Sequence, residues 1–477
     1  MAHDEHLTTP ATDASRIEEA FAWVERTLGG KLIEKEQQAR WRPQWFLKAE
    51  MPDGTVRDLM LRGRRAPFAE RGEEIRREEL YREALVTRAL QGTDVKVAEY
   101  YGFEPNDSWM LVGRLPGSPN LGDVEDLDRQ KSIFRQYMEN IAALHRLDPG
   151  TLALDEVIST PKSHEETIKT ALNEYLGPYE EYRDKDPEPL IELALWFAAT
   201  HEPKRLERMS LCTGDPGINN FMFDDNGVTG IYDFEIAYIG DPLREICQMR
   251  LKTMCHGEKT GYLRDLPEHI RYWAECVGVT LDRESIGYWT VIAMLQGPLI
   301  TYRGMRNPDP SHIAEMAHYN CFMPIYRRGM AEALAEYYDV DLEEPVRPVA
   351  KPAKLGPIYN LVRRQLTEFH APHAEGRNGF LLETTERFAN ILAIDSEIGE
   401  QVGRDNLYDL NTLLGTSFTD ESDALTALQA RIRENPIQDI AKVLQCLFNV
   451  EFRNEWFFEP VQRWAKYRSG GRMERLF

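Results

Sequence analysis

The chain has 477 residues, of which 42% are hydrophobic and 29% are charged, and its formal net charge is −22. This composition is typical of a globular protein with a large core, and the length suggests a few domains of roughly 100–200 residues each. The negative charge repels polyanions, so it argues against nucleic-acid and anionic-membrane partners unless a local basic patch serves them.

The six cysteines are scattered along the chain and form no C-x-x-C pair. Because this spacing fits neither a zinc site nor a dense disulfide framework, we expect a reducing, cytoplasmic location. The first residues lack the apolar core of a signal peptide. Residues 286–302 form the most apolar stretch, but they include Gln296 and Pro298 and are few for a membrane span. We therefore expect a buried core helix there.

Residues 1–15 are polar and are expected to be loose, whereas residues 16–115 alternate between helix and strand patterns. Helices are predicted where apolar residues recur at spacings of three and four, and strands where β-formers are bounded by turn signals. The predicted elements are a helix at 16–28, strands at 44–51 and 56–61, a helix at 73–90, and strands at 95–101 and 109–112. Together they predict a small sheet with one long helix inserted.

From residue 116 to residue 343 the pattern is mainly helical, and a short strand-rich segment at 210–235 interrupts it. The predicted helices begin near residue 129 and then cover 165–177, 188–200, 240–253, 266–276, 284–297 and 312–338. Four prolines between residues 344 and 357 indicate a linker. Residues 358–477 are helical again and are interpreted as a separate domain.

The strand-rich segment carries three polar residues that can act together. Asn226-Gly227 is a strong signal for a two-residue type I′ hairpin turn. Such a turn sets Asn220 opposite Asp233, with Cα atoms about 4.5–5.5 Å apart. An amide oxygen and a carboxylate at one end of a hairpin can hold Mg²⁺, which prefers oxygen ligands. Asp215 precedes Asn220 by five residues, in a loop that we expect near the same point.

A free carboxylate beside such a metal is the arrangement that phosphoryl transfer requires. The metal offsets phosphate charge, and the carboxylate orients an attacking hydroxyl or accepts its proton. A single exposed aspartate is usually only a solvated side chain. The prediction therefore rests on the three residues taken together.

Further motifs occur around this segment in a fixed order. The central set comprises Thr213-Gly214-Asp215, Asn220, Asp233-Phe234-Glu235 and Gly240-Asp241-Pro242. With residues 81–90, 111–117 and 141–148, it resembles the aminoglycoside phosphotransferase and choline kinase superfamily, in which these stretches are similar to the N-lobe helix, the hinge and the helix before the catalytic loop. The resemblance spans about residues 15–340.

The resemblance implies an α+β, bilobal protein-kinase-like fold, with a small β-rich N-lobe at 16–115 and a helical C-lobe at 116–343. The helical C-terminal domain at 358–477 is an addition to that fold. The resemblance also implies that ATP is the phosphoryl donor, that Asp215 is the catalytic base, and that Asn220 and Asp233 bind Mg²⁺.

Other residues would bind the nucleotide by the same resemblance. Arg62 stands where the family has a phosphate-contacting Lys or Arg, and Glu83 would be its ion-pair partner. Lys48 is the alternative cation if the strand assignment is displaced. Val112 to Arg114 would present backbone groups to adenine.

The chain departs from the family pattern at three places. Thr213 stands where the family usually has His, and Glu245 where it often has Asp. The loop near residues 37–44, which should cover the phosphates, has no glycine. We expect the side chains of Arg40 and Arg42 to replace the close backbone contacts that glycine permits.

Three interpretations of the acceptor and the activity stay open. The appended helical domain makes the chain similar to phosphotransferases associated with acyl-CoA dehydrogenase-like proteins, which implies a hydroxy acid, a hydroxyacyl-CoA or a related alcohol. The acidic segment 173–188 leaves room for an aminoglycoside- or choline-type cation, although a solvated helix face explains such a run as well. The third is a catalytically silent nucleotide-binding scaffold of the same fold.

The C-terminal residues suggest partners within the molecule or outside it. Apolar stripes at 388–398 and 440–447 are explained by helix packing, either within the chain or across a homodimer. Basic residues near the end, such as Arg463, Arg472 and Arg475, are either solvated, docked on an acidic face, or used to bind a phosphate-bearing substrate.

Overall fold

A computed structural model describes residues 14–38, 42–64, 73–104, 109–203, 206, 208–217, 220–255, 265–308, 313–352, 354–374, 376–464 and 470–476. Within these ranges, no helix is both long and apolar enough to cross a membrane.

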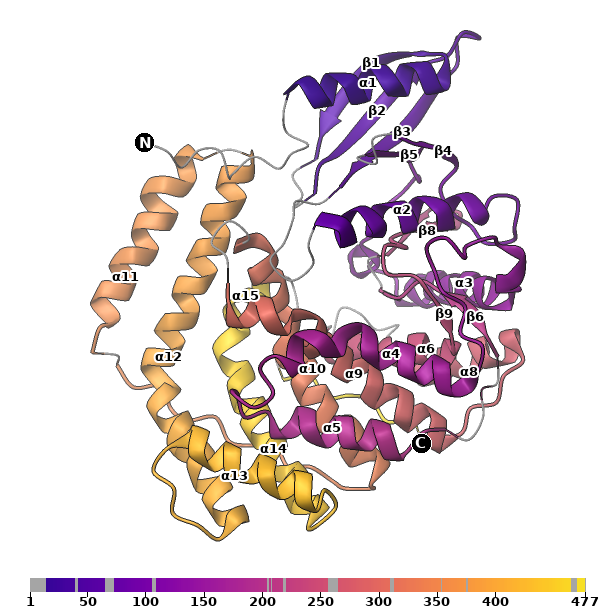
Figure 1. Ribbon diagram of the computed structural model, residues 1–477. Helices are drawn as coiled ribbons and strands as arrows, with labels where there is room; N and C mark the ends of the chain where they lie inside the picture. Colours follow the sequence, from indigo (N-terminus) through magenta and orange to yellow (C-terminus); the bar gives the residue numbers. More distant parts are fainter. Residues whose placement is uncertain are drawn as a thin grey trace.

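The N-terminal part is an antiparallel sheet of five strands with a helix against each face (Figure 1). The strands lie in the order β1-β2-β3-β5-β4. Their bounds are β1 Lys31–Gln37, β2 Gln44–Glu50, β3 Val56–Gly63, β4 Tyr100–Phe103 and β5 Trp109–Gly113, and the helices are α1 Ala14–Leu28 and α2 Glu73–Ala89.

The alternation of side chains along β3 sets the direction of Arg62. Leu59 and Leu61 pack with Phe21 of α1 in one core, whereas Met60 contacts the core on the side of α2. Successive side chains of a strand point to opposite faces of the sheet. Arg62 therefore lies on the face that α2 covers, as Met60 does.

Two of these strands differ from the predicted elements. β1 has no counterpart among them, because its sequence is mostly charged and exposed and shows no apolar alternation. It is held by backbone pairing with β2 instead. β4 begins at Tyr100, later than the strand predicted from residue 95, and Val97 forms only an isolated bridge with Ile231.

The second lobe is helical, with four short strands inserted, so the predicted two-lobed α+β architecture is confirmed. Its helices are α3 Leu127–Arg146, α4 His164–Glu180, α5 Pro189–Thr200, α6 Pro242–Gln248, α7 Arg250–Cys255, α8 Leu266–Val277, α9 Arg283–Arg306 and α10 Ile313–Tyr337. Its strands are β6 Ser210–Cys212, β7 Phe221–Asp224, β8 Gly227–Ile231 and β9 Tyr238–Gly240. The helix predicted at 240–253 is two helices, because the chain turns at Met249.

Helix α9 contains the apolar stretch at 286–302 and runs beside α10 in the middle of this lobe (Figure 1). Trp289, Val291 and Leu295 are fully buried in the large core of the lobe. The prediction of a core helix is therefore confirmed.

The C-terminal region adds five helices to the two lobes. They are α11 Gly356–Arg364, α12 Gly376–Leu414, α13 Glu421–Glu434, α14 Ile440–Glu455 and α15 Glu459–Trp464. The first of them begins inside the stretch that we interpret as a linker. The other domain boundaries stay predictions.

Buried ion pairs join the C-terminal helices to the helical lobe. Arg327 of α10 contacts Glu188 before α5 and, at 3.1 Å, Glu451 of α14. Its neighbour Arg328 is fully buried and lies 2.5 Å from Glu455 of α14. Buried charges are tolerated only when they are paired, so these contacts fix how α14 sits on α10.

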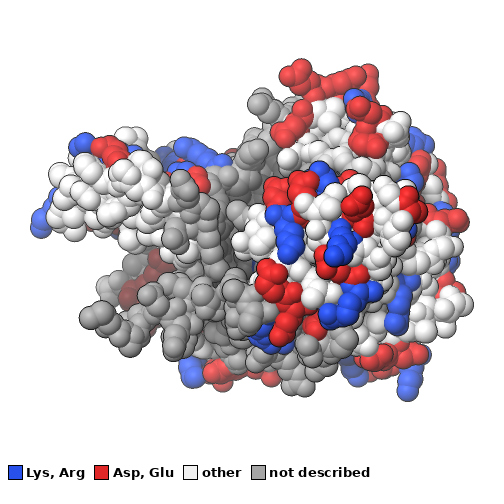
Figure 2. Space-filling view, turned by 90° about the horizontal axis from the view of Figure 1, so that it is seen from above, with Lys and Arg blue, Asp and Glu red and all other residues white. Residues whose placement is uncertain are grey.

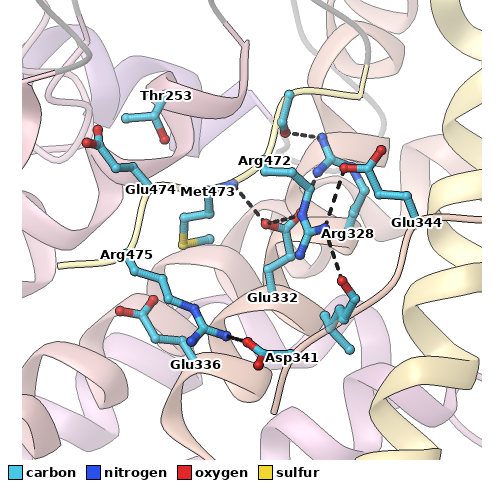
Figure 3. Close-up of polar contacts among 12 residues, drawn as sticks. Thr253, Arg328, Glu332, Glu336, Asp341, Glu344, Arg472, Met473, Glu474 and Arg475 are labelled. Atoms are coloured by element: carbon cyan, nitrogen blue, oxygen red, sulfur yellow. Dashed lines mark hydrogen bonds and ion pairs between the residues drawn. The ribbon is translucent and has the colours of Figure 1, made fainter. Parts of the chain in front are cut away.

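Residues 470–476 lie across α10 in the same region (Figure 3). The guanidinium of Arg472 is 3.1 Å from Glu332, and that of Arg475 is 3.0 Å from Asp341. For these two arginines, docking on an acidic face is therefore the correct interpretation.

Candidate active site

β7 and β8 form the predicted hairpin, but the predicted turn and register are wrong. The two turn residues are Asp225 and Asn226, and the observed pairs are Phe221↔Ile231, Met222↔Gly230, Phe223↔Val228 and Asp224↔Gly227. Neither turn residue has a positive φ, which a type I′ turn requires at both. Gly227, which follows the turn, has a φ of 117°. A Cβ at that position would lie 2.0 Å from Oε1 of Gln136.

This register sets Asn220 opposite Tyr232 rather than Asp233. The backbone N–H of Tyr232 donates to the carbonyl oxygen of Asn220 at 3.0 Å. Asp233 is the next residue along the chain, so it still follows directly on the pair that closes the hairpin. Asn220 and Asp233, the two predicted metal ligands, therefore still lie next to each other, although the observed pairing differs from the predicted one by one residue.

Asn220 is linked directly to Asp215. Its Nδ2 amide donates to the backbone oxygen of Asp215 at 2.9 Å and to carboxylate Oδ2 at 3.0 Å. The N–H of Gly217 donates to the same backbone oxygen at 2.7 Å. These bonds hold the Asp215 carboxylate in one orientation. They also turn the amide oxygen of Asn220 away from Asp215, because the nitrogen faces it.

Asp233 has a φ of 74°, a conformation that non-glycine residues adopt rarely. Its side chain is 24% exposed and accepts a hydrogen bond from Nη2 of Arg62 at 2.5 Å. Such backbone conformations cost energy and concentrate at functional sites. Asp233 is thereby aimed at Arg62, across the boundary between the two lobes.

A buried cluster of charges surrounds Arg62. Its Nε lies 2.9 Å from Oε2 of Glu83 on α2, which is the predicted ion pair. Arg42 donates to Glu235 and lies 3.8 Å from Glu83. The cluster thus joins the sheet, α2 and the segment after β8. Glu235 was part of the motif Asp233-Phe234-Glu235, but it was not predicted to be a site residue. Its position two residues after Asp233, with the buried Phe234 between them, was a signal that it could face the same site.

Burial and charge act against each other in this cluster. Burial alone would lower the pKa of Arg62, but Glu83, Asp233 and Glu235 outweigh it and raise that pKa. Burial raises the pKa of Glu83 to about 7, against the opposing charge of Arg62. Desolvation favours the neutral form of a carboxylic acid. Glu83 can therefore gain a proton near neutral pH.

Two groups of side chains could supply oxygen ligands to a metal. Glu83, Asp233 and Glu235 have carboxylate oxygens within 4.8 Å of one another, but Arg42 and Arg62 already serve these acids as cations. Asn220 and Asp233 offer an amide oxygen and a partly exposed carboxylate instead. Oxygen ligands of this kind fit Mg²⁺, which fills its other positions with water and phosphate.

Of the alternative cations, Lys48 does not reach this cluster. Lys48 lies on β2 opposite Asp58, and its Nζ is 2.6 Å from Glu34 at the surface. Arg40 lies outside the described residues. Arg42 is described, but its guanidinium contacts carboxylates of the cluster and is not directed to an open phosphate site.

The structure does not favour Val112 to Arg114 as the adenine-contacting residues. β5 is an inner strand, and Val112 pairs with both Met60 and Tyr100. The N–H of Gly113 donates to Glu99 and that of Arg114 to Asp58. The guanidinium of Arg114 stacks on the ring of Phe46, 3.9 Å from its centroid. The N–H groups of Gly113 and Arg114 are thus already engaged, and the contact of this segment with adenine stays a prediction.

A buried carboxylate anchors the start of the Asp215 loop. Glu245 accepts hydrogen bonds from the backbone N–H groups of Thr213 at 2.8 Å and Gly214 at 3.1 Å, and from the Thr213 hydroxyl. Its other oxygen lies 2.6 Å from Nε2 of His145. Trp273 donates to Nδ1 of that imidazole at 3.1 Å. Since an indole N–H can only donate, His145 carries its proton on Nε2 and donates it to Glu245.

A cavity of about 590 Å³ lies beside this loop. Three cationic side chains line it, those of Arg82, Lys169 and Arg244, together with two acids, Glu166 and Asp241. Ala237 also lines it, and the preceding Ile236 lies against Gly214, where a Cβ would be 2.1 Å from the Ile236 oxygen.

The comparison with family models covers the centre of the chain. Residues 55–272 match the model of the phosphotransferase enzyme family. This part of the chain is similar to that family. The match supports the predicted enzyme class, a small-molecule phosphotransferase. A comparison with curated protein sequences finds no match.

Solved structures show the same fold. A protein of Ralstonia eutropha assigned as an aminoglycoside phosphotransferase is 17% identical, with a TM-score of 0.51 over 67% of this chain and 98% of that one. A macrolide 2′-phosphotransferase of Brachybacterium faecium is 19% identical, with a TM-score of 0.44 over 63% of this chain and 98% of that one. At these identities, and with the first TM-score alone above 0.5, the likeness supports the kinase-like fold and nothing finer.

Proposed function

We propose that this kinase transfers the γ-phosphate of ATP to the hydroxyl group of a small acidic alcohol. The observation that supports the phosphoryl transfer is the convergence of Asp215, Asn220 and Asp233 at the end of one hairpin. Their hydrogen bonds hold the Asp215 carboxylate next to oxygen ligands for a divalent cation, and this is what such transfer needs.

Asp215 is the proposed base. Asn220 holds its carboxylate by a 3.0 Å hydrogen bond, so the second oxygen can accept the proton of an attacking hydroxyl. Asn220 and Asp233 are the proposed Mg²⁺ ligands, and the bound metal would offset phosphate charge. Each residue has one defined task, and none depends on a large rearrangement of the hairpin.

Arg62 is the proposed phosphate contact. It presents Nη2 toward Asp233 while Glu83 holds its Nε at 2.9 Å. A guanidinium held at one edge keeps its other N–H groups in a fixed direction, which suits the planar recognition of phosphate oxygens. Glu83 is therefore a positioning residue, and it acts through Arg62.

The cavity beside the loop supports an acidic acceptor. Its two acids are already engaged, because Glu166 accepts the N–H of Lys162 at 2.6 Å and Asp241 caps α6 and accepts from Trp289 at 3.1 Å. The cations Arg82, Lys169 and Arg244 outnumber these acids in the lining, although Lys169 also pairs with Glu165 at 2.5 Å. A hydroxy acid, or its CoA thioester, fits that charge.

A polycationic acceptor has less support. The acidic segment 173–188 is the feature that favoured it, yet Glu188 is paired with Arg306 at 3.1 Å and with Arg327. Asp186 likewise lies 3.2 Å from Arg306. Arginines of α9 and α10 thus already pair with these two acids, which are therefore not available to a cationic acceptor.

The test is Mg²⁺-dependent transfer of labelled γ-phosphate from ATP to a panel of hydroxy acids, their CoA thioesters, amino sugars and choline-like alcohols. We expect phosphorylation of an acidic alcohol, and none in an Asp215→Asn control. The Lys169→Glu variant should raise the KM for that acceptor about tenfold, the effect of losing about 1.4 kcal/mol, and leave the KM for ATP unchanged. Lys162→Glu is the matched control, since Lys162 does not line the cavity. Phosphorylation of amino sugars alone would contradict the acidic acceptor but not the kinase.

A further inference from the structure

The cavity beside the Asp215 loop takes its lining from both lobes. Arg82 comes from α2, whereas Lys169 lies on α4 and Arg244 on α6 of the helical lobe. Figure 1 shows α2 between the five-stranded sheet and the helices of that lobe. A ligand that fills this cavity therefore touches the two lobes at once.

Arg82 has a donor that no described residue uses. Its Nε is buried and has no hydrogen-bond partner in the part of the chain that the structure describes. A buried donor without a partner costs stability, so a buried orphan group is a sign of an ion, a water or a ligand. Since a guanidinium recognises a carboxylate through parallel N–H groups, Arg82 suits an anionic ligand.

The attraction of this cavity for anions is local. The chain as a whole has a net charge of −22, and acidic and basic side chains are interspersed on the face seen from above (Figure 2). In the cavity, Glu166 already accepts a backbone N–H and Asp241 caps α6. Arg244 is 6% exposed, and its guanidinium lies 4.0 Å from the ring centroid of Tyr238. Two arginines from different lobes, Arg82 and Arg244, thus face one cavity.

Arg82 stands next to Glu83 in α2. Neighbouring side chains of a helix point about 100° apart, because one turn takes 3.6 residues. The same helix therefore turns Arg82 to the cavity and Glu83 to Arg62, whose Nε it holds at 2.9 Å. The preceding Tyr81 donates to Glu156 of the helical lobe at 2.8 Å. The position of α2 thus affects the cavity and the cluster around Arg62 together.

We propose that Arg82 binds the anionic group of the acceptor and thereby couples acceptor binding to nucleotide binding. This role rests on the acidic acceptor proposed for the cavity. An anion held by Arg82 from one lobe and by the lining of the other fixes α2 relative to the helical lobe. Glu83 then holds Arg62 in its direction toward Asp233. By linkage, each ligand raises the affinity for the other by the same factor.

The experiment is isothermal titration calorimetry of the full chain with 3-hydroxybutyrate, a small acidic alcohol, and with a non-hydrolysable ATP analogue and Mg²⁺. We expect saturating 3-hydroxybutyrate to tighten the binding of the analogue about fivefold or more in the wild type, as is usual for two coupled sites. In Arg82→Gln, 3-hydroxybutyrate should bind more weakly and the tightening should be lost. Arg88→Gln is the matched control, since Arg88 is exposed on α2 and does not line the cavity.

Two further variants separate anion binding from coupling. Lys169→Glu should weaken the binding of 3-hydroxybutyrate but keep the tightening at saturation, because Lys169 lies on α4 and not on α2. Without nucleotide, Glu83→Gln should bind 3-hydroxybutyrate as the wild type does, and it should lose the tightening. An equal effect of 3-hydroxybutyrate on the wild type and on Arg82→Gln, or no effect on the wild type, would overturn the proposal.

The transfer assay separates this proposal from the proposed function. Phosphorylation of acidic alcohols by Arg82→Gln at the wild-type kcat/KM would leave the function in place and overturn the role of Arg82. Tightening by 3-hydroxybutyrate, without phosphorylation of any acidic alcohol, would overturn the acceptor class. The coupling through Arg82 would then stand as that of an anion site which controls nucleotide binding.

Discussion

The carboxylate of Glu245 accepts the backbone N–H of Thr213 at 2.8 Å and so fixes the strand end from which the Asp215 loop starts. By the resemblance, His is usual at the position of Thr213 and Asp at the position of Glu245, so both residues depart from the family pattern. The longer Glu side chain reaches the hydroxyl and backbone of the shorter Thr. We interpret the two departures as compensating each other.

Glu245→Gln should destabilise the protein by about 1–3 kcal/mol, the cost of a buried polar group left without a partner. The new amide can still accept from Thr213 with its oxygen, but its N–H₂ then faces the Nε2–H of His145, so two donors oppose each other. Chemical denaturation of the variant and the wild type gives the difference. No loss of stability would mean that the His145 proton is not on Nε2.

Trp273 holds that proton in place, which gives a second variant. In Trp273→Phe the imidazole is free to move its proton to Nδ1, and Nε2 can then accept from the glutamine of Glu245→Gln. The double variant should therefore be more stable than the sum of the two single effects predicts, by about 0.5–3 kcal/mol, the range for coupled neighbours. Strict additivity would contradict the assigned tautomer.

Arg62→Met should lower kcat/KM for ATP roughly 10- to 100-fold, because a hydrogen bond to a charged group is worth about 1.5–3 kcal/mol. Arg62→Lys should recover part of the loss, since it keeps the charge beside Glu83. Lys48→Met is the control and should behave as wild type. If Lys48→Met shows the loss instead, the phosphate contact is on β2. Thermal unfolding of each variant separates an effect on binding from an effect on folding.

The activity should rise with pH through neutrality because of Glu83. Its pKa is raised to about 7, so a part of the protein carries a neutral Glu83 below that pH and holds Arg62 less tightly. Glu83→Gln should be less active and should lack this contribution to the pH profile of kcat/KM for ATP. Comparing the two profiles removes the titration of ATP, which they share. Parallel profiles would contradict the role of Glu83.

Rising pH should lower the stability of the folded protein, in the opposite direction to its effect on the activity. The folded protein holds the Glu83 proton up to about pH 7, whereas the unfolded chain releases it near the ordinary value of 4.5. The folded state thus binds more protons between these values, and rising pH removes stability across that window. Denaturation midpoints at pH 5 and pH 7 should therefore differ more in the wild type than in Glu83→Gln.

The sequence was sufficient to predict the helices and strands that have a local pattern of apolar residues. The helix at Glu73–Ala89 and the strand at Val56–Gly63 have clear periodicity, and their alternation places Arg62 and Glu83 on facing sides. The order of the motifs then indicated the two lobes. The exposed and charged β1 could not be predicted in this way, because its pairing with β2 and not its own side chains holds it in the sheet.

The parts that failed depend on contacts between distant residues. Asn226-Gly227 suggested a type I′ turn, but Gln136 of α3 packs against Gly227, and the turn moves back by one residue. Val112 to Arg114 were expected to present backbone groups to adenine, yet the N–H groups of Gly113 and Arg114 donate to Glu99 and Asp58. Likewise, no local sequence pattern predicts the contact between Arg42 and Glu235, because these residues lie far apart in the chain.

The most direct test of the account is a single-turnover assay of phosphate transfer from ATP, run on the wild type and on Asp215→Asn together with a nucleotide-binding measurement. We predict that Asp215→Asn binds Mg²⁺–ATP as the wild type does and transfers phosphate about 10²–10⁴-fold more slowly, the usual contribution of a general base. Transfer at the wild-type rate by Asp215→Asn would contradict the assignment of Asp215 as the base.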